Sequence, residues 1–426
     1  MIKKIFKNKF GKAVFVVASG TFLAQFISAI VSPIITRVYS PEEYGVLTLY
    51  ASVLSVFAIS SLKYEIAIPI SRNEKIAINV LLLSILILSG FVIVLTIALY
   101  LFGSFILNYF NYGLLNDFII LIPIGVFLSG LYRIFRQWAL RVKEFNSISI
   151  TTFTQSLLGN VLKVILGLFG MGSFGLILGQ IIGQSAGLTR LSKPVLSKKK
   201  TLFEYIKIRK IIWCIKRYKD FPIYNTSIDF LSTFGKQFPT IFIATFFGSQ
   251  VVGLYGLAYT IVRLPMRLIG TAIGDVFYAE AASIGRKNPK KLKQLSNKLI
   301  LRLSLIGIIP IITILLFGPE LFQIVFGNLW YEAGIYARII SIMLFSILIF
   351  APVSRVYEVF EKQKLRLLID IFRTVLVVLV FSASWYFKLG PYLTIFLYSI
   401  VISIIHLVIF IVAQKIMNME IEKVNE

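Results

Sequence analysis

The sequence predicts an all-α polytopic membrane protein, with twelve transmembrane helices arranged as a parallel repeat of two six-helix lobes. Hydrophobic residues make up 58% of the 426 residues, and the mean hydropathy is +0.86. These residues form continuous runs of about 20 residues, the length at which a helix spans the bilayer core. Lys and Arg concentrate in every second gap between the runs, a pattern typical of membrane proteins whose basic loops share one side.

Each apolar run is long enough to cross the bilayer as a helix. The alternative spanning structure, a β-barrel, needs alternating segments of about ten residues, whereas these runs are continuous. The first run holds about 23 residues, more than the apolar core of a signal peptide, so we expect a retained helix that begins on the cytoplasmic side. The predicted spans are residues 13–35, 45–62, 76–101, 116–135, 147–167, 170–191, 221–243, 250–273, 297–317, 331–351, 367–387 and 391–413.

The cations predict the orientation of the chain. It carries 44 Lys and Arg against 19 Asp and Glu, a net charge of +25. With a cytoplasmic N-terminus, 37 of the 44 lie in cytoplasmic segments, and the outside loops hold only Arg37 and Lys388. The positive-inside rule therefore places both termini in the cytoplasm. Basic loops of this kind contact anionic membrane lipids, so we expect lipid partners and no nucleic acid.

The composition offers little for catalysis. The chain has one cysteine, Cys214, and one histidine, His406, which excludes an internal disulfide and argues against a His/Cys metal site. We expect neither a metal nor a cofactor. The outside loops are short, the longest spanning about 13 residues near 318–330, so none can fold as a catalytic domain. We therefore expect a protein that is not an enzyme.

The longest basic gap divides the chain into two halves. We expect an N-terminal lobe over 1–192, a basic cytoplasmic linker over 193–220, and a C-terminal lobe with a short cytoplasmic tail over 221–426. The linker contains isoleucines at the spacing i, i+3, i+4, i+7, which predicts an amphipathic helix on the inner leaflet. A disordered basic linker is the alternative. The isoleucines are Ile208, Ile211, Ile212 and Ile215.

The two halves begin with similar polar stripes. Each stripe has the spacing i, i+4, i+7, i+11, which places its members on one face of a helix. Because each half has an even number of helices, the halves enter from the same side, and transporters built in this way bind substrate between the lobes. The alternative is that polar stripes only join helices together. The stripes are Thr21, Gln25, Ser28 and Ser32, and Asn225, Asp229, Ser232 and Lys236.

A third stripe, on the sixth run, is made of glycine. Gly175, Gly179, Gly183 and Gly187 follow one another at every fourth residue. Such a stripe lets a second helix approach closely, so we interpret it as packing within the first lobe rather than as a binding site.

Four cations inside or at the end of the spans are the main candidates for a substrate site. A charge at the centre of a span is costly, so it usually faces a water-filled cavity or a partner. Lys236 and Arg338 lie more than a turn from any end, whereas snorkelling can also explain Lys163 and Arg37. All four gather toward the outer half. With Gln25 of the first polar stripe, they form our candidate set for binding an anionic phosphate or diphosphate.

Other charges in the spans have simpler interpretations. Arg302 and Arg373 lie near cytoplasmic ends, where snorkelling explains them. Asp229 lies two turns before Lys236. It either pairs with Lys236 or titrates and couples transport to protons.

Several motifs give the chain a family resemblance. The sequence resembles the polysaccharide-biosynthesis flippases, the Wzx-type translocases of O-antigen or capsule repeat units, in the multidrug/oligosaccharidyl-lipid/polysaccharide exporter superfamily. The resemblance covers essentially the whole chain. The motifs are Ser32-Pro33 through Pro41-Glu42-Glu43-Tyr44-Gly45, Ser61-Leu62-Lys63-Tyr64-Glu65, Gln137-Trp138-Ala139-Leu140-Arg141, and the glycine-rich stretch from Gly172 to Gly183.

The resemblance implies alternating access by two six-helix lobes around a cationic cavity in a bacterial inner membrane. Its implied substrate is an undecaprenyl-diphosphate-linked oligosaccharide, moved from the cytoplasmic to the outer leaflet for O-antigen, capsule or exopolysaccharide synthesis. Polysaccharide assembly proteins are the implied partners. Two alternatives stay open: a drug or metabolite antiporter of the same fold, which a cationic cavity disfavours for cationic drugs, and a membrane-embedded polysaccharide polymerase.

Overall fold

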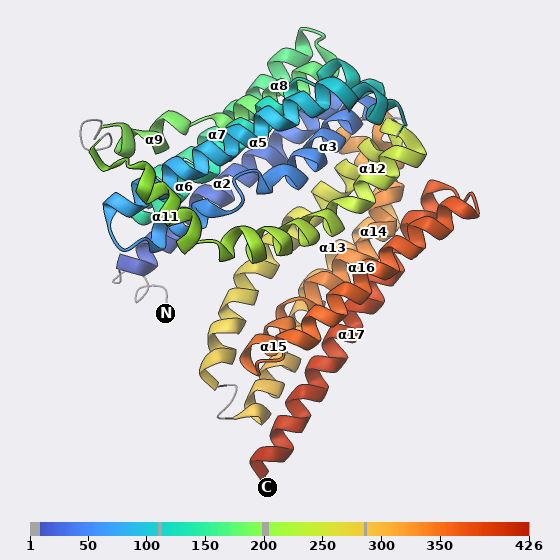
Figure 1. Ribbon diagram of the computed structural model, residues 1–426. Helices are drawn as coiled ribbons and strands as arrows, with labels where there is room; N and C mark the ends of the chain where they lie inside the picture. Colours follow the sequence, from blue (N-terminus) through green and yellow to red (C-terminus); the bar gives the residue numbers. More distant parts are fainter. Residues whose placement is uncertain (1–8, 110–112, 198–203, 285–287, 426) are drawn as a thin grey trace. The chain divides into compact units, whose positions relative to one another are not determined.

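The protein is helical throughout the described residues, with two compact units. The computed structural model describes residues 9–109, 113–197, 204–284 and 288–425 (Figure 1). The first unit is Met1–Gly253 and the second is Leu254–Glu426. The boundary falls inside a long helix, whereas the expected division of the lobes at 193–220 stays a prediction.

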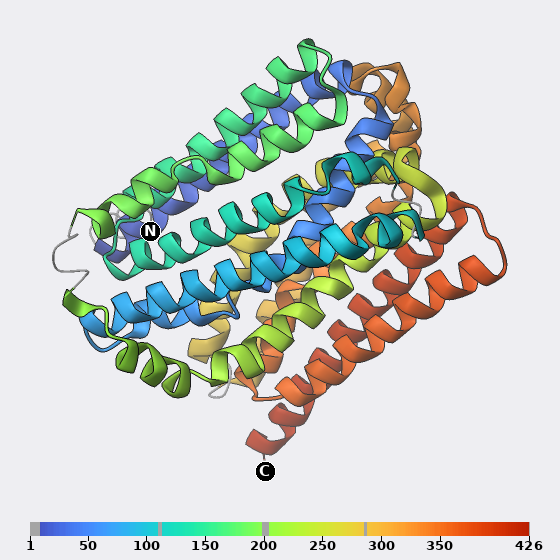
Figure 2. The same ribbon diagram turned by 45° about the horizontal axis from the view of Figure 1, so that its top comes forward.

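The first unit is built from long helices joined by short turns. Its long helices α2, α7 and α8 pack side by side, as Figures 1 and 2 show, and α3, α5 and α6 complete the bundle. In order, the elements are α2 (Lys9–Val38), α3 (Pro41–Val56), η1 (Phe57–Ile59), η2 (Tyr64–Ile66), α4 (Ala67–Ile70), α5 (Glu74–Tyr109), η3 (Gly113–Phe118), α6 (Leu121–Arg141), α7 (Phe145–Leu168), α8 (Gly172–Ser185), α9 (Leu188–Leu196), α11 (Ile208–Arg217), η4 (Phe221–Asn225) and the first part of α12 (Thr226–Ile284).

The second unit contains the rest of α12 and four further long helices. Helix α14 packs against both α13 and α17, and α16 packs against α17. The remaining elements are α13 (Pro289–Phe326), η5 (Asn328–Trp330), α14 (Tyr331–Phe350), η6 (Pro352–Arg355), α15 (Val356–Val359), α16 (Gln363–Tyr386) and α17 (Pro391–Asn425).

Every predicted span corresponds to a helix, which confirms the fold class. In the described residues, eight helical segments have the length and apolar content needed to cross a membrane. One of them, Phe221–Met266, holds two predicted spans, separated at Gly248, where the backbone turns through φ 84°. Helices α6, α7 and α8 account for the other three spans. Helix α8 has only 14 residues, and polar side chains of all three helices line a cavity.

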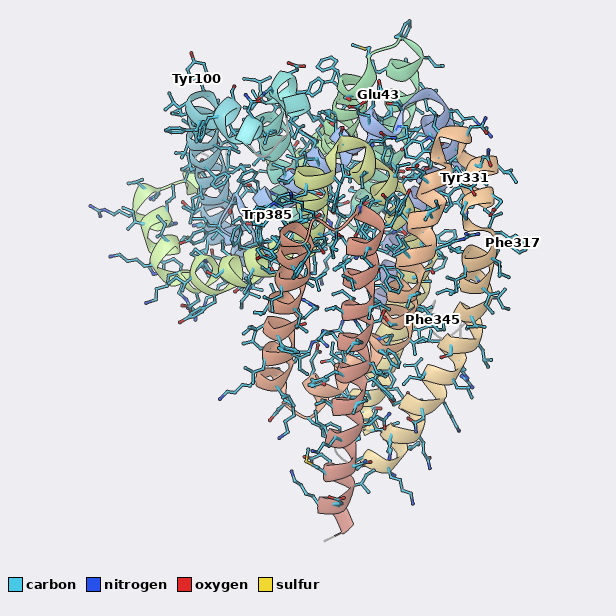
Figure 3. All side chains as sticks on the ribbon, turned by 90° about the vertical axis from the view of Figure 1, so that its right-hand side faces the viewer. Glu43, Tyr100, Phe317, Tyr331, Phe345 and Trp385 are labelled. Atoms are coloured by element: carbon cyan, nitrogen blue, oxygen red, sulfur yellow. The ribbon has the colours of Figure 1, made fainter. Side chains whose placement is uncertain are left out.

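The outer surface of the helices is apolar, as expected for a chain surrounded by lipid. Phe317 on α13 and Tyr100 on α5 are exposed, and Figure 3 shows their side chains projecting outward. Exposed hydrophobic side chains recur along most of the long helices. In water such a surface would drive aggregation, so this distribution supports a membrane location.

The linker contains a helix, α11, at the position of the predicted amphipathic helix. Ile211 and Cys214 are buried in a core with Leu81 of α5 and Trp138 of α6. The other three isoleucines of the predicted face are exposed, Ile208 at 70%, Ile212 at 47% and Ile215 at 42%. A helix is thus present in the linker over Ile208–Arg217 and is attached to the first unit through Ile211 and Cys214, whereas its place on the inner leaflet stays a prediction. The lysines at 198–200 lie outside the described residues.

The glycine stripe packs α8 against α7, as the sequence predicted. A Cβ on Gly183 would lie 2.8 Å from the Cα of Gly159, so the two backbones approach too closely for a side chain. The stripe ends earlier than expected, because Gly187 has φ 80° and caps α9 instead of continuing α8. Close packing here fixes which residues of α7 and α8 face each other.

Candidate functional site

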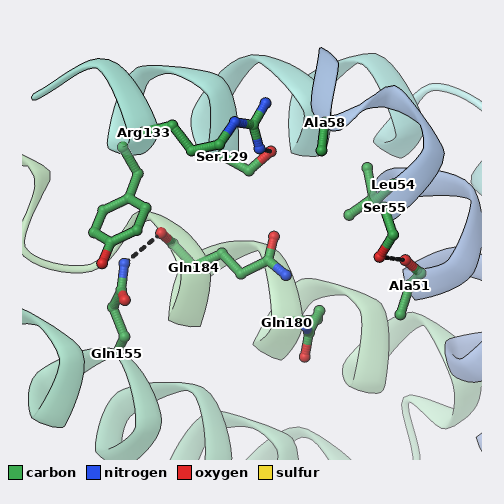
Figure 4. Close-up of a pocket in the computed structure, with 10 residues that line it drawn as sticks. Ala51, Leu54, Ser55, Ala58, Ser129, Arg133, Gln155, Gln180 and Gln184 are labelled. Atoms are coloured by element: carbon green, nitrogen blue, oxygen red, sulfur yellow. Dashed lines mark hydrogen bonds between the residues drawn. The ribbon is translucent and has the colours of Figure 1, made fainter. Parts of the chain in front are cut away.

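A polar cavity of about 370 Å³ lies inside the first unit, among α3, α6, α7 and α8. Figure 4 shows its four principal polar side chains, which come from three of these helices: Arg133 from α6, Gln155 from α7, and Gln180 and Gln184 from α8. The other lining residues are Ala51, Leu54, Ser55, Ala58, Ser129 and Tyr132. A cavity within a membrane bundle that carries a cation and three amides suits a polar, anionic ligand.

A second, smaller cavity of about 180 Å³ extends this lining toward Lys163. It shares Gln155, Gln180 and Gln184 with the larger cavity. The ammonium of Lys163 donates a hydrogen bond of 2.7 Å to Oε1 of Gln180. At 1.5 Å per residue, Lys163 lies about 12 Å further along α7 than Gln155. The polar lining therefore extends along more than two turns of α7.

Arg133 is the cation most available to a ligand in the larger cavity. Its guanidinium makes two long hydrogen bonds to hydroxyls, 3.4 Å to Ser129 and 3.3 Å to Ser60. Its Nε is buried without a hydrogen-bond partner, and no carboxylate among the described residues lies within 4.0 Å of the guanidinium. Buried Glu65 lies farther away and is hydrogen-bonded to Ser61 at 2.6 Å. A half-buried cation with weak partners favours anion binding.

The first polar stripe joins helices rather than lining the larger cavity. Ser28 of α2 lies 3.0 Å from Ser156 of α7 and accepts a 3.0 Å hydrogen bond from Asn160. Ser156 in turn donates to the carbonyl of Ala24 at 2.6 Å. Gln25, a predicted substrate residue, belongs to the same helix, and its Oε1 is buried without a hydrogen-bond partner. Ser28 thus both joins α2 to α7 and lines the smaller cavity.

The predicted site residues are not all in one place. Lys163 lines the smaller cavity, whereas Arg37 at the end of α2 and Lys236 on α12 are exposed. Asp229 pairs with Lys63, which lies 2.8 Å away, rather than with Lys236, and its alternative role in proton coupling stays a prediction. The sequence did not indicate Lys63, because only the folded chain brings the turn after α3 to the beginning of α12. The role of the four cations in substrate binding stays a prediction.

Arg338 lies in the second unit and holds two helices together. Its guanidinium donates a 2.5 Å hydrogen bond to the carbonyl of Leu316 on α13 and lies 3.5 Å from the carboxylate of Glu320. Gly334, one turn earlier on α14, packs directly on the backbone of Pro319. Arg338 therefore has helix-joining contacts of its own.

The second unit also has a charged cluster that the sequence analysis did not single out. Asp370 on α16 lies between Arg366 at 3.1 Å and Arg373 at 3.0 Å. Their spacing, i, i+4 and i+7, places all three on one helix face. We interpreted Arg373 alone, as a snorkelling side chain, and this spacing was the signal we missed. Arg133 was likewise counted only as an orienting charge, because it lies at the cytoplasmic end of the predicted span 116–135, whereas α6 continues to Arg141.

Carboxylates and histidines in the described part of the chain do not assemble into a metal centre. No group of three or more His, Cys, Asp or Glu gathers there. Buried His406 instead contacts the carbonyl of Ile402 at 2.8 Å. The absence of a cofactor stays a prediction.

The fold is that of the transporters of the MOP (multidrug/oligosaccharidyl-lipid/polysaccharide) superfamily. An inward-facing multidrug resistance MATE family transporter superimposes with a TM-score of 0.69 at 16% identity, covering 93% of this chain and 96% of that one. The lipid II flippase MurJ gives 0.72 at 15% identity, covering 94% and 87%. A MOP superfamily transporter from Pyrococcus furiosus, described as having a binding pocket of reverse polarity, gives 0.56 at 16% identity, covering 96% of both chains.

Residues 34–334 match the family model described as polysaccharide biosynthesis protein, which is more than half of the chain. The chain belongs to this family, and the family resemblance seen in the sequence is confirmed. A comparison with curated proteins gives no match.

Proposed function

We propose that the protein is a flippase that moves an undecaprenyl-diphosphate-linked oligosaccharide from the cytoplasmic to the outer leaflet by alternating access. The family places it in polysaccharide biosynthesis, and the fold is that of membrane transporters, one of them a lipid II flippase. The two lobes would be 1–192 and 221–426, joined by the linker. The membrane would be the bacterial inner membrane, with both termini in the cytoplasm.

The observation that carries this proposal is the weakly partnered guanidinium of Arg133 in a cavity of about 370 Å³. A guanidinium binds phosphate oxygens in a bidentate manner, and its attraction is strong where water is scarce. In the predicted orientation, α6 ends in the cytoplasm, so Arg133 lies toward the side from which the substrate enters. Lys163, deeper in the first unit, would meet the substrate later in its path.

We propose that the remaining predicted residues make secondary contacts with the substrate. Arg37, Lys236 and Arg338, with Gln25, would contact the substrate in other states of the transport cycle. Asp229 would contribute through its pair with Lys63.

Deleting the gene tests the proposed function. We expect lipid-linked repeat units to accumulate on the cytoplasmic leaflet, where externally added glycan-modifying enzymes do not reach them in intact spheroplasts. Unpolymerised units exposed on the outer leaflet would instead indicate a polymerase. Normal surface polysaccharide with a changed efflux of small molecules would indicate an antiporter, although Arg133 and Lys163 would repel cationic drugs.

A further inference from the structure

Three glutamines form a distinct part of the cavity of the first unit. Gln180 and Gln184 are four residues apart on α8, so they lie on one helix face, and Gln155 faces them from α7. All three are half-buried and line both cavities. These glutamines are uncharged and lie within helices. The positive-inside rule, which accounts for the charges in the loops, therefore does not account for them.

Protein contacts hold two of these amides in place while leaving part of each unused. Gln155 donates its Nε2 to the backbone carbonyl of Gln184 at 2.7 Å, and Figure 4 marks this bond. Gln180 accepts from Lys163 through Oε1. The Oε1 of Gln155, the Nε2 of Gln180 and the whole side-chain amide of Gln184 make no hydrogen bond to any described residue. The cavity thus presents one oriented acceptor on Gln155, one oriented donor on Gln180 and the amide of Gln184, to which no described residue is hydrogen-bonded.

This chemistry differs from that of Arg133. A carboxamide has both a hydrogen-bond donor and an acceptor. It therefore matches a sugar hydroxyl or an acetamido group, since each of these also has a donor and an acceptor. It has no charge with which to attract a phosphate, which is bound best by guanidinium or ammonium groups. A site with pre-oriented amides therefore selects a ligand by its pattern of hydrogen-bonding groups.

We propose that Gln155, Gln180 and Gln184 form a sugar-recognition site, which binds the neutral sugar nearest the diphosphate while Arg133 binds the diphosphate itself. This inference rests on the proposed function and adds that different residues bind the sugar and the diphosphate. Lipid-linked substrates that share the carrier and differ in the first sugar are then distinguished by the amides. Arg133 determines the affinity for undecaprenyl diphosphate, the carrier that all of these substrates share.

Binding measurements on the full chain in nanodiscs test this inference. The probes are undecaprenyl diphosphate alone and the same carrier bearing N-acetylglucosamine, glucose or galactose. We expect the wild-type chain to bind at least one sugar-bearing probe more tightly than the bare carrier. We expect Gln184→Ala to weaken that probe by about threefold to tenfold, the effect of one or two lost hydrogen bonds, and to leave the bare carrier within about twofold.

The controls separate this inference from the proposed function. Arg133→Gln should weaken all probes alike, and Gln323→Ala, at an exposed glutamine on α13, should change none. If the wild-type chain binds no undecaprenyl-diphosphate probe, the proposed function fails. If it binds all probes equally, or if Gln184→Ala weakens the bare carrier as much as the sugar-bearing probe, the amides do not recognise sugar, and the inference is overturned while the flippase proposal stands.

Discussion

The ammonium of Lys63 lies 2.8 Å from the carboxylate of Asp229. Lys63 belongs to a turn that the sequence marked as a family motif, and its own φ of 59° is left-handed. Asp229 belongs to the polar stripe that begins α12. The pair ties this turn to α12 within the first unit.

A double-mutant cycle tests this pair. We expect Asp229→Asn and Lys63→Met each to lower stability slightly, with a coupling energy of about 0.2–1 kcal/mol. The effect is small because the Asp229 side chain is 47% exposed and solvent screens the charges. Thermal unfolding of the single and double variants in detergent measures it. Coupling of Asp229 to Lys236 and not to Lys63 would contradict the assignment.

Gly45 on α3 and Gly253 on α12 face each other at a close approach of two helices in the first unit. A Cβ on Gly45 would overlap the carbonyl of Ser249, and a Cβ on Gly253 would overlap that of Pro41. We expect Gly45→Ala to destabilise the protein by about 1–3 kcal/mol, since backbone atoms cannot easily give way. The matched control is Gly90→Ala on α5, where a Cβ meets nothing within 4 Å. Equal melting temperatures for Gly45→Ala and wild type would refute the close approach.

Cys214 reports on the attachment of α11 to the first unit. Burial raises the pKa of its thiol to about 11, so roughly one molecule in a thousand carries the thiolate at pH 8. We expect slow maleimide labelling in the native protein and rapid labelling in denaturing detergent, because only the thiolate is nucleophilic. The native rate should rise about tenfold per pH unit beyond pH 9, where an ordinary thiol levels off.

An exposed position on the same helix provides the control. Ile208→Cys in a Cys214→Ser background should label rapidly under native conditions, since Ile208 is 70% exposed. Rapid native labelling of Cys214 itself would mean that α11 leaves the core in which the structure places it.

Arg338 makes contacts that stabilise the second unit whether or not it also binds substrate. Losing its charged hydrogen bond to the Leu316 carbonyl should lower stability by about 1–2 kcal/mol in Arg338→Ala. Transport rates measured per folded molecule then separate the two roles. An unchanged rate would remove Arg338 from the substrate site, and a lowered rate at normal protein levels would keep it there.

The fold was predictable because only α-helices and closed β-barrels can span the hydrocarbon core of a bilayer. A backbone in hydrocarbon must satisfy its own hydrogen bonds, so each apolar run becomes a helix. The glycine stripe on α8 was predictable for a similar reason, since a surface without side chains invites close packing. The isoleucine spacing in the linker coincides with helix α11, but of its four isoleucines only Ile211 is buried.

The site was harder to predict because tertiary contacts determine what each charge does. Position within a run selected both Lys163, which lines the smaller cavity, and Arg338, which joins α13 to α14. Arg133 lies near the end of a predicted span, so we counted it with the cytoplasmic cations that orient the chain. Its role depends on which side chains surround it, namely two hydroxyls and, among the described residues, no carboxylate within 4.0 Å, and no local pattern encodes that.

Translocation in proteoliposomes tests the central claim, that Arg133 binds the diphosphate of a lipid-linked oligosaccharide, most directly. The measurement follows a fluorescent undecaprenyl-diphosphate-linked oligosaccharide as it becomes accessible to a membrane-impermeant reductant. We predict that Arg133→Gln lowers the initial rate at least about tenfold, the effect of a lost charged hydrogen bond. Arg136→Gln, three residues along α6 and outside the cavity lining, should stay within about twofold at equal protein incorporation. Equal rates for Arg133→Gln and wild type would contradict the account.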